Sequence, residues 1–245
     1  MEKVELLNVH VNNLTMHEAL SEIEKYIKQD TKSYVVAVNV DVIMKIEQDQ
    51  YLRDITNYAN MVLVDGKPLV WISKLYKRPI KEKISGSDLV PQLCRISAIQ
   101  GYTIFILGGR DGVAQKAKKN LEKSYPGIII VGCYSPPFGF ERDRHEVEKI
   151  NQLINQEKPD LLIVCFGCPK QEKYIYENIN KYNAKVSICA GATVDFLAGN
   201  VKRAPKLVSD MGFEWLYRFT RDPKRLFKRY FIDDMKIIKL IRKYR

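Results

Sequence analysis

The chain has 245 residues, of which 46% are apolar and 28% charged, and this balance excludes a disordered or fibrous chain. Its net charge is +11, and residues 201–245 hold 14 Lys or Arg against 5 Asp or Glu, a net +9. No apolar run approaches the roughly 18–20 residues of a membrane-spanning helix, so we expect any membrane contact to be peripheral. We predict a nearly neutral body (residues 1–200) and a basic tail (residues 201–245) suited to phosphate groups, an anionic membrane surface or nucleic acid.

The five cysteines and the lack of a signal peptide favour a reducing cytoplasm. Cys165 and Cys168 form a C-x-x-C pair, the spacing of redox centres and of half a zinc site. No second pair has ligand spacing, and the three histidines are scattered along the chain. We therefore expect no metal site and no cofactor, and we interpret the cysteines as small hydrophobic core residues.

The N-terminal part of the chain alternates short apolar runs with amphipathic segments. A capping box formed by Thr15 and Glu18 predicts the start of a helix that ends near residue 29. A strand or hairpin is predicted at 4–11, and further strands are predicted at 33–40 and 61–64. One helix is predicted to begin at residue 41, a second to end just before residue 61, and two more to span 67–76 and 87–99.

From residue 102 onward, continuous β-branched runs alternate with amphipathic helices. The predicted strands are 102–107, 128–133, 161–166 and 185–190, and the intervening helices are 111–124, 142–156 and 169–179. This order predicts an α/β fold with a Rossmann-like, mostly parallel sheet covered by helices on both faces. Ligands of such sheets bind beyond the carboxyl ends of the strands, so we expect the site in the loops that follow the strands.

The pattern changes after residue 200. Arg203-Ala204-Pro205 interrupts the chain, and two basic amphipathic helices are predicted at 205–219 and 223–243, the second beginning at Pro223. Arginines are interleaved there with aromatic residues, and these types suit bidentate phosphate contacts and a membrane interface. The alternative is an amphipathic helix that packs on the body with its charges in water.

Two strand-end loops contain residues suited to a binding site. Gly108 and Gly109 stand between a strand and a helix, where backbone N–H groups can approach an anion, although the motif is neither G-x-G-x-x-G nor a P-loop. Lys170 and Gln171 follow Gly167-Cys168-Pro169 in the first turn of a helix, a position from which they can contact substrate hydroxyls. A tight turn and an ordinary helix start are the structural alternatives.

Asp65 ends an apolar strand and is followed by Gly66. A carboxylate there can accept a proton from an attacking sugar hydroxyl, although aspartate is also common in turns and caps. Asn39 and Asp41 end the neighbouring strand, so we expect them beside Asp65.

Together, these segments resemble the WecG/TagA/CpsF family of bacterial glycosyltransferases (glycosyltransferase family 26). The resemblance rests on an ordered set of motifs that spans nearly the whole chain. They are Val64-Asp65-Gly66, Ser85-Gly86-Ser87-Asp88, Leu107-Gly108-Gly109, Gly167-Cys168-Pro169-Lys170-Gln171-Glu172, Ala198-Gly199 with Arg203-Ala204-Pro205, and Glu214-Trp215-Leu216-Tyr217-Arg218 with Pro223 and Arg225.

The resemblance implies an inverting, metal-independent transferase. Its substrates would be UDP-ManNAc and membrane-held undecaprenyl-diphosphate-GlcNAc, as in the linkage unit of wall teichoic acid, and UDP-ManNAcA is the alternative donor. Asp65 matches the family's general base, and the tail arginines match those that hold the donor diphosphate. We expect peripheral association with the inner face of the cell membrane. The sequence does not decide whether the protein forms a homo-oligomer. The predicted substrate-binding residues are Ala37, Asn39, Gly66, Gly108, Gly109, Lys170, Gln171, Arg203, Arg218 and Arg225.

One position departs from the family pattern. The family's Thr-x-Asn at the end of the second strand reads Ala37-Val38-Asn39 here, so a hydroxyl that normally contacts substrate is missing. The departure indicates a branch adapted to alanine, a weakened enzyme, or a non-catalytic UDP-sugar sensor. A nucleic-acid-binding protein that uses the basic tail is the competing class. The tail's amphipathic faces and the lack of a nucleic-acid motif in the body argue against it.

Overall fold

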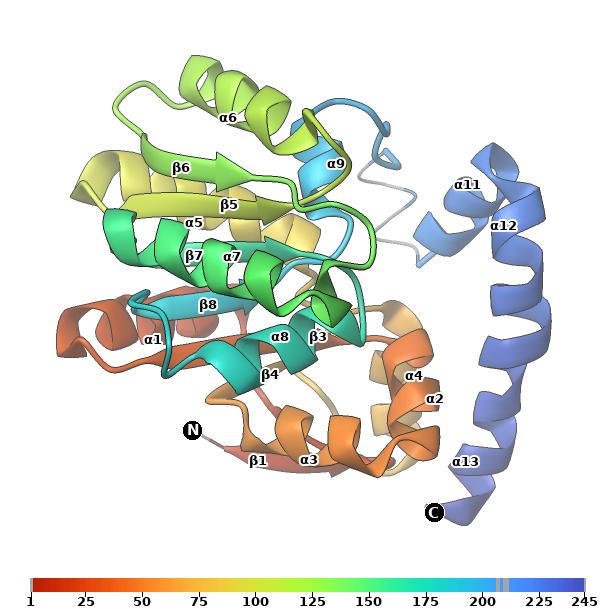
Figure 1. Cartoon of the computed structure of the whole chain (residues 1–245). Helices are drawn as coiled ribbons and strands as arrows, with labels where there is room; N and C mark the ends of the chain where they lie inside the picture. Colours follow the sequence, from red (N-terminus) through yellow and green to blue (C-terminus); the bar gives the residue numbers. More distant parts are fainter. Residues whose placement is uncertain (1, 206–207, 209–211, 245) are drawn as a thin grey trace.

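The fold was analysed in a computed structural model that describes residues 2–205, 208 and 212–244. Its centre is a six-stranded parallel sheet in the order β4-β3-β8-β7-β5-β6 (Figure 1). A separate antiparallel hairpin pairs β1 (Lys3–Leu6) with β2 (Val9–Asn12). The sheet strands are β3 (Ser33–Val38), β4 (Met61–Val64), β5 (Thr103–Gly108), β6 (Ile129–Tyr134), β7 (Leu161–Cys165) and β8 (Val186–Cys189). The predicted Rossmann-like α/β class is confirmed.

Helices cover both faces of the sheet. One face packs against α2 (Val40–Gln48), α3 (Gln50–Tyr58), α4 (Lys67–Leu75), α7 (Arg144–Glu157) and α8 (Lys170–Asn178). The other packs against α1 (Met16–Gln29), α5 (Gly86–Gln100), α6 (Val113–Ser124) and α9 (Thr193–Leu197). A short 3₁₀ helix, η1 (Phe140–Arg142), precedes α7.

Alternation along the strands explains these two layers. Phe105 and Leu107 of β5 belong to the first core, whereas Ile104 and Ile106 belong to the second. Successive side chains of a strand point to opposite faces, so a strand that is apolar at every position must be covered on both sides. The continuous β-branched runs of the sequence therefore set the three-layer arrangement.

Local capping fixes where several helices begin. The capping box of α1 is present: the Glu18 N–H donates to Thr15 Oγ1 at 3.3 Å, and the Thr15 N–H donates to Glu18 Oε2 at 2.7 Å. Ser85 caps α5 through a 3.1 Å bond from the Asp88 N–H. Helix α9 was not predicted, since its five residues are too few to show a helical period.

The basic tail returns to the body and runs beside the carboxyl edge of the sheet (Figure 1). Its described elements are α11 (Glu214–Arg221), α12 (Pro223–Lys228), the π-helical η2 (Arg229–Asp233), η3 (Asp234–Lys236) and α13 (Ile237–Lys243). The predicted helix at 223–243 is confirmed as a run of helical segments. Residues 206–207 and 209–211 of the other predicted helix lie outside the described residues.

The end of the tail is anchored on the body. Leu240 of α13 is buried in the first core, and the Tyr76 hydroxyl donates to the Ile241 carbonyl at 2.9 Å. Lys243 forms a 2.7 Å ion pair with Glu47 of α2. In the part of the chain described, no helix combines the length and apolar character needed to cross a bilayer.

Candidate active site

Asn39 and Asp65 leave the sheet side by side. Strands β3 and β4 are parallel, with Val38 in register with Val64, and the Asp65 N–H donates to the Val38 carbonyl at 2.7 Å. The chain therefore emerges from both strands at the same edge, as the sequence led us to expect. Asn39 also caps α2, because its Oδ1 accepts the Val42 N–H at 3.1 Å.

A cavity of about 390 Å³ opens at this edge, between the body and the tail. Its volume falls in the range of about 300–1,000 Å³ that is usual for small-molecule sites. The charged residues that line it comprise four carboxylates and four cations: Asp41, Asp65, Glu214, Asp234, Lys67, Lys83, Arg218 and Arg229. Gly66 and Asn39 line it too. The cavity thus combines a candidate base with several cations.

Asp65 has the environment of a general base. Burial raises the pKa of its carboxyl above the ordinary value, while the charges of Arg218 and Lys83 lower it and those of Glu214 and Asp88 raise it. The N-cap of α4 is Gly66, which has no side chain to cap the helix. A carboxyl with a raised pKa is a stronger proton acceptor when ionised.

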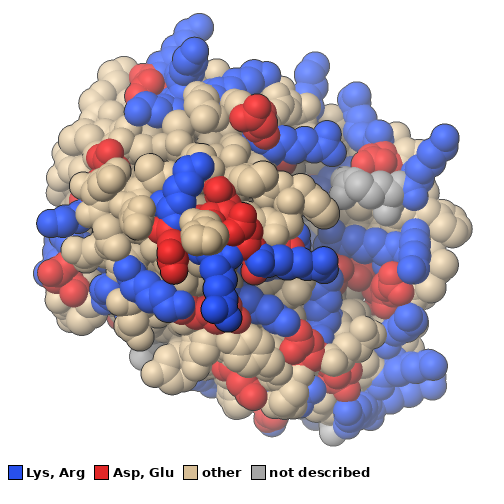
Figure 2. Space-filling model, viewed as in Figure 1, with Lys and Arg blue, Asp and Glu red and all other residues tan. Residues whose placement is uncertain are grey.

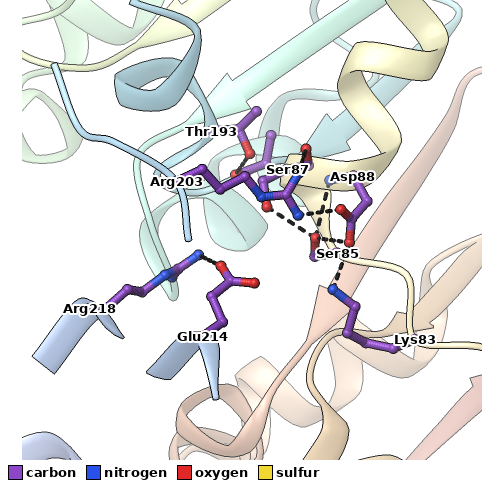
Figure 3. A network of polar contacts seen from close by, with 9 residues as sticks. Lys83, Ser85, Ser87, Asp88, Thr193, Arg203, Glu214 and Arg218 are labelled. Carbon is purple, nitrogen blue, oxygen red and sulfur yellow. Dashed lines mark hydrogen bonds and ion pairs between the residues drawn. The ribbon is translucent and has the colours of Figure 1, made fainter. Parts of the chain in front are cut away.

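The tail supplies one wall of the cavity. Arg218 of α11 pairs with Glu214 one turn earlier and lies 5.2 Å from the centroid of the Phe196 ring (Figure 3). Trp215 packs edge-on against Tyr230 and Phe231, with ring centroids 5.8 and 6.4 Å apart, and all three line the cavity. The side chain of Arg225 lies outside the described part of the structure.

A second group of charges joins the tail to α2. The Arg229 guanidinium lies 3.6 Å from Asp41 and 3.9 Å from Asp234, and Asp41 also pairs with Lys45 at 2.8 Å. Burial raises the pKa of Asp234 to about 6, against the lowering effect of Arg229. These contacts hold the tail against the rim of the cavity.

Asp88, in the first turn of α5, binds two cations. Asp88 accepts a 2.7 Å hydrogen bond from Lys83, which lines the cavity, and it pairs with Arg203 at the start of the tail (Figure 3). Burial alone would raise the pKa of Asp88, but the hydrogen bonds from Lys83, Ser85 and Arg203 lower it to about 2. Asp88 is therefore ionised at neutral pH.

Ala37, Gly108 and Gly109 do not line the cavity, although all three lie at the carboxyl ends of strands. Ala37 is half-buried and in register with Leu63 of β4. Gly108 has φ +120°, and a Cβ there would lie 2.6 Å from the Cys165 carbonyl oxygen. Gly108 thus permits close strand packing, and an anion-binding role for this loop stays a prediction.

Lys170 and Gln171 likewise lie outside the cavity. Lys170 forms a 2.6 Å ion pair with Glu141 and lies 4.6 Å from the Phe138 ring centroid. Gln171 is buried, and its Oε1 accepts the N–H groups of Gly167 and Gly191 at 3.2 and 3.0 Å. Gln171 therefore ties together the loops that follow β7 and β8.

The two cysteines of the C-x-x-C pair are in the interior. Cys165 is buried, and burial raises the pKa of its thiol to about 12; burial also raises the pKa of the Cys168 thiol. A thiol must lose its proton to act as a nucleophile or metal ligand. These environments suit the packing role expected for the pair.

Sequence reasoning missed several residues of the cavity. Lys83 follows no strand, and Glu214 occurred only within a family motif, so neither was assigned a role. Trp71 lies on a helix that seemed merely amphipathic. The available signal was the closeness of Lys83 to the Ser85–Asp88 motif, since a lysine two residues before a helix cap can reach the carboxylate in the first turn.

The surface charge separates the tail from the body. Figure 2 shows Lys and Arg side chains gathered over the tail, whereas both signs are mixed on the front of the body. Several large apolar side chains of the tail are also exposed, namely Phe227, Phe231, Ile232, Met235 and Ile238. The surface of the tail therefore presents apolar and cationic groups together.

The cavity lies at the carboxyl edge of a parallel α/β sheet, where such folds bind their ligands, and its carboxylates and cations suit a group-transfer enzyme. The model of the glycosyl transferase WecG/TagA/CpsF family matches residues 4–245, so the chain belongs to that family and is a glycosyltransferase. It is similar to the N-acetylglucosaminyldiphosphoundecaprenol N-acetyl-beta-D-mannosaminyltransferases of Staphylococcus aureus strains MRSA252, MW2 and NCTC 8325. Each is 29% identical over 226 residues, which cover 91% of this chain and 87% of the relative.

Proposed function

We propose that this glycosyltransferase moves N-acetylmannosamine from UDP-ManNAc to undecaprenyl-diphosphate-GlcNAc, without a metal and with inversion at the anomeric carbon. The product would be the linkage unit of a wall teichoic acid. The family and the names of the relatives support the sugar and the acceptor. The observation that carries the reaction is Asp65, a carboxyl with a raised pKa in a cavity that also holds cations from the body and the tail.

The reaction is a single displacement. Ionised Asp65 accepts the proton of the acceptor's 4-hydroxyl, and the oxygen attacks the anomeric carbon of the donor from the side opposite the diphosphate. The bond from that carbon to the diphosphate oxygen breaks, and UDP leaves with the electron pair. One bond forms as one breaks, so the configuration at the carbon inverts.

The leaving diphosphate needs positive charge. Lys83 from the body and Arg218 from α11 line the same cavity as Asp65, and both act on its pKa. Preorganised cations stabilise developing negative charge most strongly where water is displaced. Protein cations can therefore take the place of a bound metal in this mechanism.

The tail would also place the enzyme at its lipid substrate. We propose that residues 1–200 form the catalytic body, and that the tail completes the site and docks on the inner face of the cell membrane. The support is the joint exposure of Phe227, Ile232 and Ile238 with the tail's basic residues. Such surfaces bind anionic bilayers through apolar burial and charge.

The test is UDP release from UDP-ManNAc in the presence of a short-chain lipid-diphosphate-GlcNAc. Asp65→Asn should lower turnover by on the order of 10²–10⁴-fold, because the general base is lost. Asp54→Asn, at an exposed aspartate of α3 that does not line the cavity, is the matched control and should leave turnover unchanged. Near-normal turnover by Asp65→Asn would remove Asp65 from the mechanism.

The same assay separates the alternatives. Preference for UDP-ManNAcA would replace the proposed donor, and loss of activity with EDTA would contradict metal independence. Binding of UDP-ManNAc without transfer to any acceptor would favour a sensor. Salt-sensitive binding of DNA or RNA in preference to anionic vesicles would favour the nucleic-acid class.

A further inference from the structure

Asp88 binds one cation that lines the cavity and one at the start of the tail. Its Oδ2 accepts hydrogen bonds from Lys83 Nζ and Ser85 Oγ, both at 2.7 Å, while its Oδ1 binds the guanidinium of Arg203. Figure 3 shows Lys83 and Arg203 approaching the carboxylate from different sides. One carboxylate oxygen thus binds a lysine that lines the cavity, and the other binds an arginine at the start of the tail.

The local structure fixes Asp88 in place. It lies in the first turn of α5, its N–H donates to the capping Ser85 Oγ at 3.1 Å, and Ser85 also contacts the Ser87 hydroxyl at 3.0 Å. Gly86 lets this turn pack closely on the end of β8, because a Cβ there would lie 3.2 Å from Ala190. The carboxylate is therefore held by the helix start and by the strand-end edge.

Lys83 depends on this carboxylate for its position. Its side chain is 13% exposed, and its ion pair with Asp88 at 2.7 Å is a short contact between partly buried groups. A lysine side chain has several rotatable bonds and loses rotamer freedom when it is held in one geometry. Without Asp88, the ammonium group has many positions available and only some of them face the cavity.

Arg203 is held at the other oxygen. Its Nη1 also donates to the Ser87 carbonyl at 3.0 Å, so the guanidinium binds two successive residues of the α5 start. Arg203 therefore helps to fix the position of the Asp88 carboxylate, which binds Lys83 through its other oxygen.

We propose that Asp88 is a positioning residue for the transfer reaction: with its other oxygen bound by Arg203, it aims the Lys83 ammonium at the leaving diphosphate. This inference rests on the proposed function. Asp88 does not itself line the cavity, whereas Lys83 does, so Asp88 acts through Lys83.

The test is a double-mutant cycle measured as kcat and KM for UDP-ManNAc with the soluble acceptor. Asp88→Asn and Lys83→Met should each lower kcat by about 10- to 100-fold with a smaller change in KM, because a misplaced group costs most in the transition state. In the Lys83→Met background, Asp88→Asn should add at most about a twofold further loss. Lys81→Met is the matched control, since Lys81 pairs with exposed Glu18 and lies outside the cavity.

A second cycle covers the case in which Asp88→Asn does not fold. Lys83→Met and Arg203→Met should then be non-additive in kcat, because Arg203 acts by holding the Asp88 carboxylate that positions Lys83. Additive losses in these cycles would overturn the positioning role while leaving the proposed function intact. A wild-type enzyme that releases no UDP from UDP-ManNAc would instead overturn the proposed donor, and this inference with it.

Discussion

At Asp65, burial and charge act on one carboxyl in opposite directions. Burial raises its pKa, Arg218 and Lys83 lower it, and the net shift is upward. The base works only when ionised, so kcat/KM should fall as the pH drops through a pKa above the usual 3.8. A pH profile of UDP release checks this, and an acid limb at or below the usual value would contradict the raised pKa.

The same shift has a consequence for stability. A raised pKa means that the native state holds the proton more tightly than the unfolded chain does, so stability falls as the pH rises through the folded pKa. Asp65→Asn removes this loss. The melting temperature of the variant, relative to the wild type, should therefore increase from acid to neutral pH. A variant less stable than the wild type at neutral pH would show that Asp65 supports the fold.

Ala37 offers a test of the family's missing hydroxyl. It is half-buried at the end of β3, two residues before Asn39 of the cavity. Ala37→Thr should raise turnover if the chain is a weakened member, because the hydroxyl can again contact substrate. Ala37→Val is the matched control, since it adds nearly the same volume without the hydroxyl. Unchanged or lower turnover by Ala37→Thr would show that this chain is adapted to alanine, and an equal gain from Ala37→Val would show that the hydroxyl is not the cause.

Residues differ in how far the sequence could predict their roles. Asp65 and Asn39 were placed together correctly, because parallel neighbours end at one edge. Lys83 and Asp234 were not assigned to the cavity, because their positions depend on how a loop and a distant helix fold back. Gly108 had a clear motif, yet its φ and its contact with Cys165 could not be predicted from residue types alone.

At the scale of elements, the sequence predicted strands more fully than it predicted the tail. The strands are continuous β-branched runs, which have few alternative structures in a chain of this length. In the tail, the amphipathic period predicted helix but not the change to π- and 3₁₀-helical pitch at η2 and η3. That change places Arg229 beside Asp41 and Asp234, a tertiary contact that local sequence does not encode.

Helix α11 contains two arginines in different environments, so one can be substituted as the test and the other as its control. Arg218 lines the cavity, whereas Arg221 is exposed and contacts only Tyr217 in the described structure. Arg218→Ala should lower kcat by on the order of 10²-fold, because a cation near the leaving diphosphate is lost. It should also move the acid limb of the pH profile upward, since Arg218 lowers the pKa of Asp65.

Arg221→Ala controls for the general effect of removing a positive charge from α11. It should leave both kcat and the acid limb unchanged on the soluble acceptor. Equal losses from the two substitutions would mean that α11 acts through its net charge rather than through Arg218 in the cavity.

At the scale of the whole molecule, body and tail form the site together. The cavity is lined by residues of both, and Leu240 and Lys243 fasten the end of the tail to the body. The fold class could be predicted because the strands of the sheet are continuous apolar runs, whereas the helices that cover it show a helical period of apolar residues. The closure of the tail over Asp65 could not, because it depends on contacts between residues that are far apart in the chain, such as Tyr76 and Ile241.

The tail can serve the chemistry, the membrane contact or both, and truncation after Asn200 separates these roles. The shortened chain loses +9 of the +11 net charge together with Arg218 and Arg229, while it keeps the whole sheet and Asp65. We expect it to be nearly inactive on a soluble short-chain acceptor that needs no membrane. Circular dichroism should show that the α/β body stays folded.

Vesicle binding completes the comparison. Each Lys or Arg near an anionic bilayer contributes about 1 kcal/mol, so the full chain should bind anionic vesicles in a salt-sensitive way and the truncated chain should not. If the tail served only as a membrane anchor, truncation would abolish vesicle binding and leave turnover of the soluble acceptor intact. Loss of both supports one tail with two roles, because the groups that line the cavity and the exposed apolar groups lie on the same helical run.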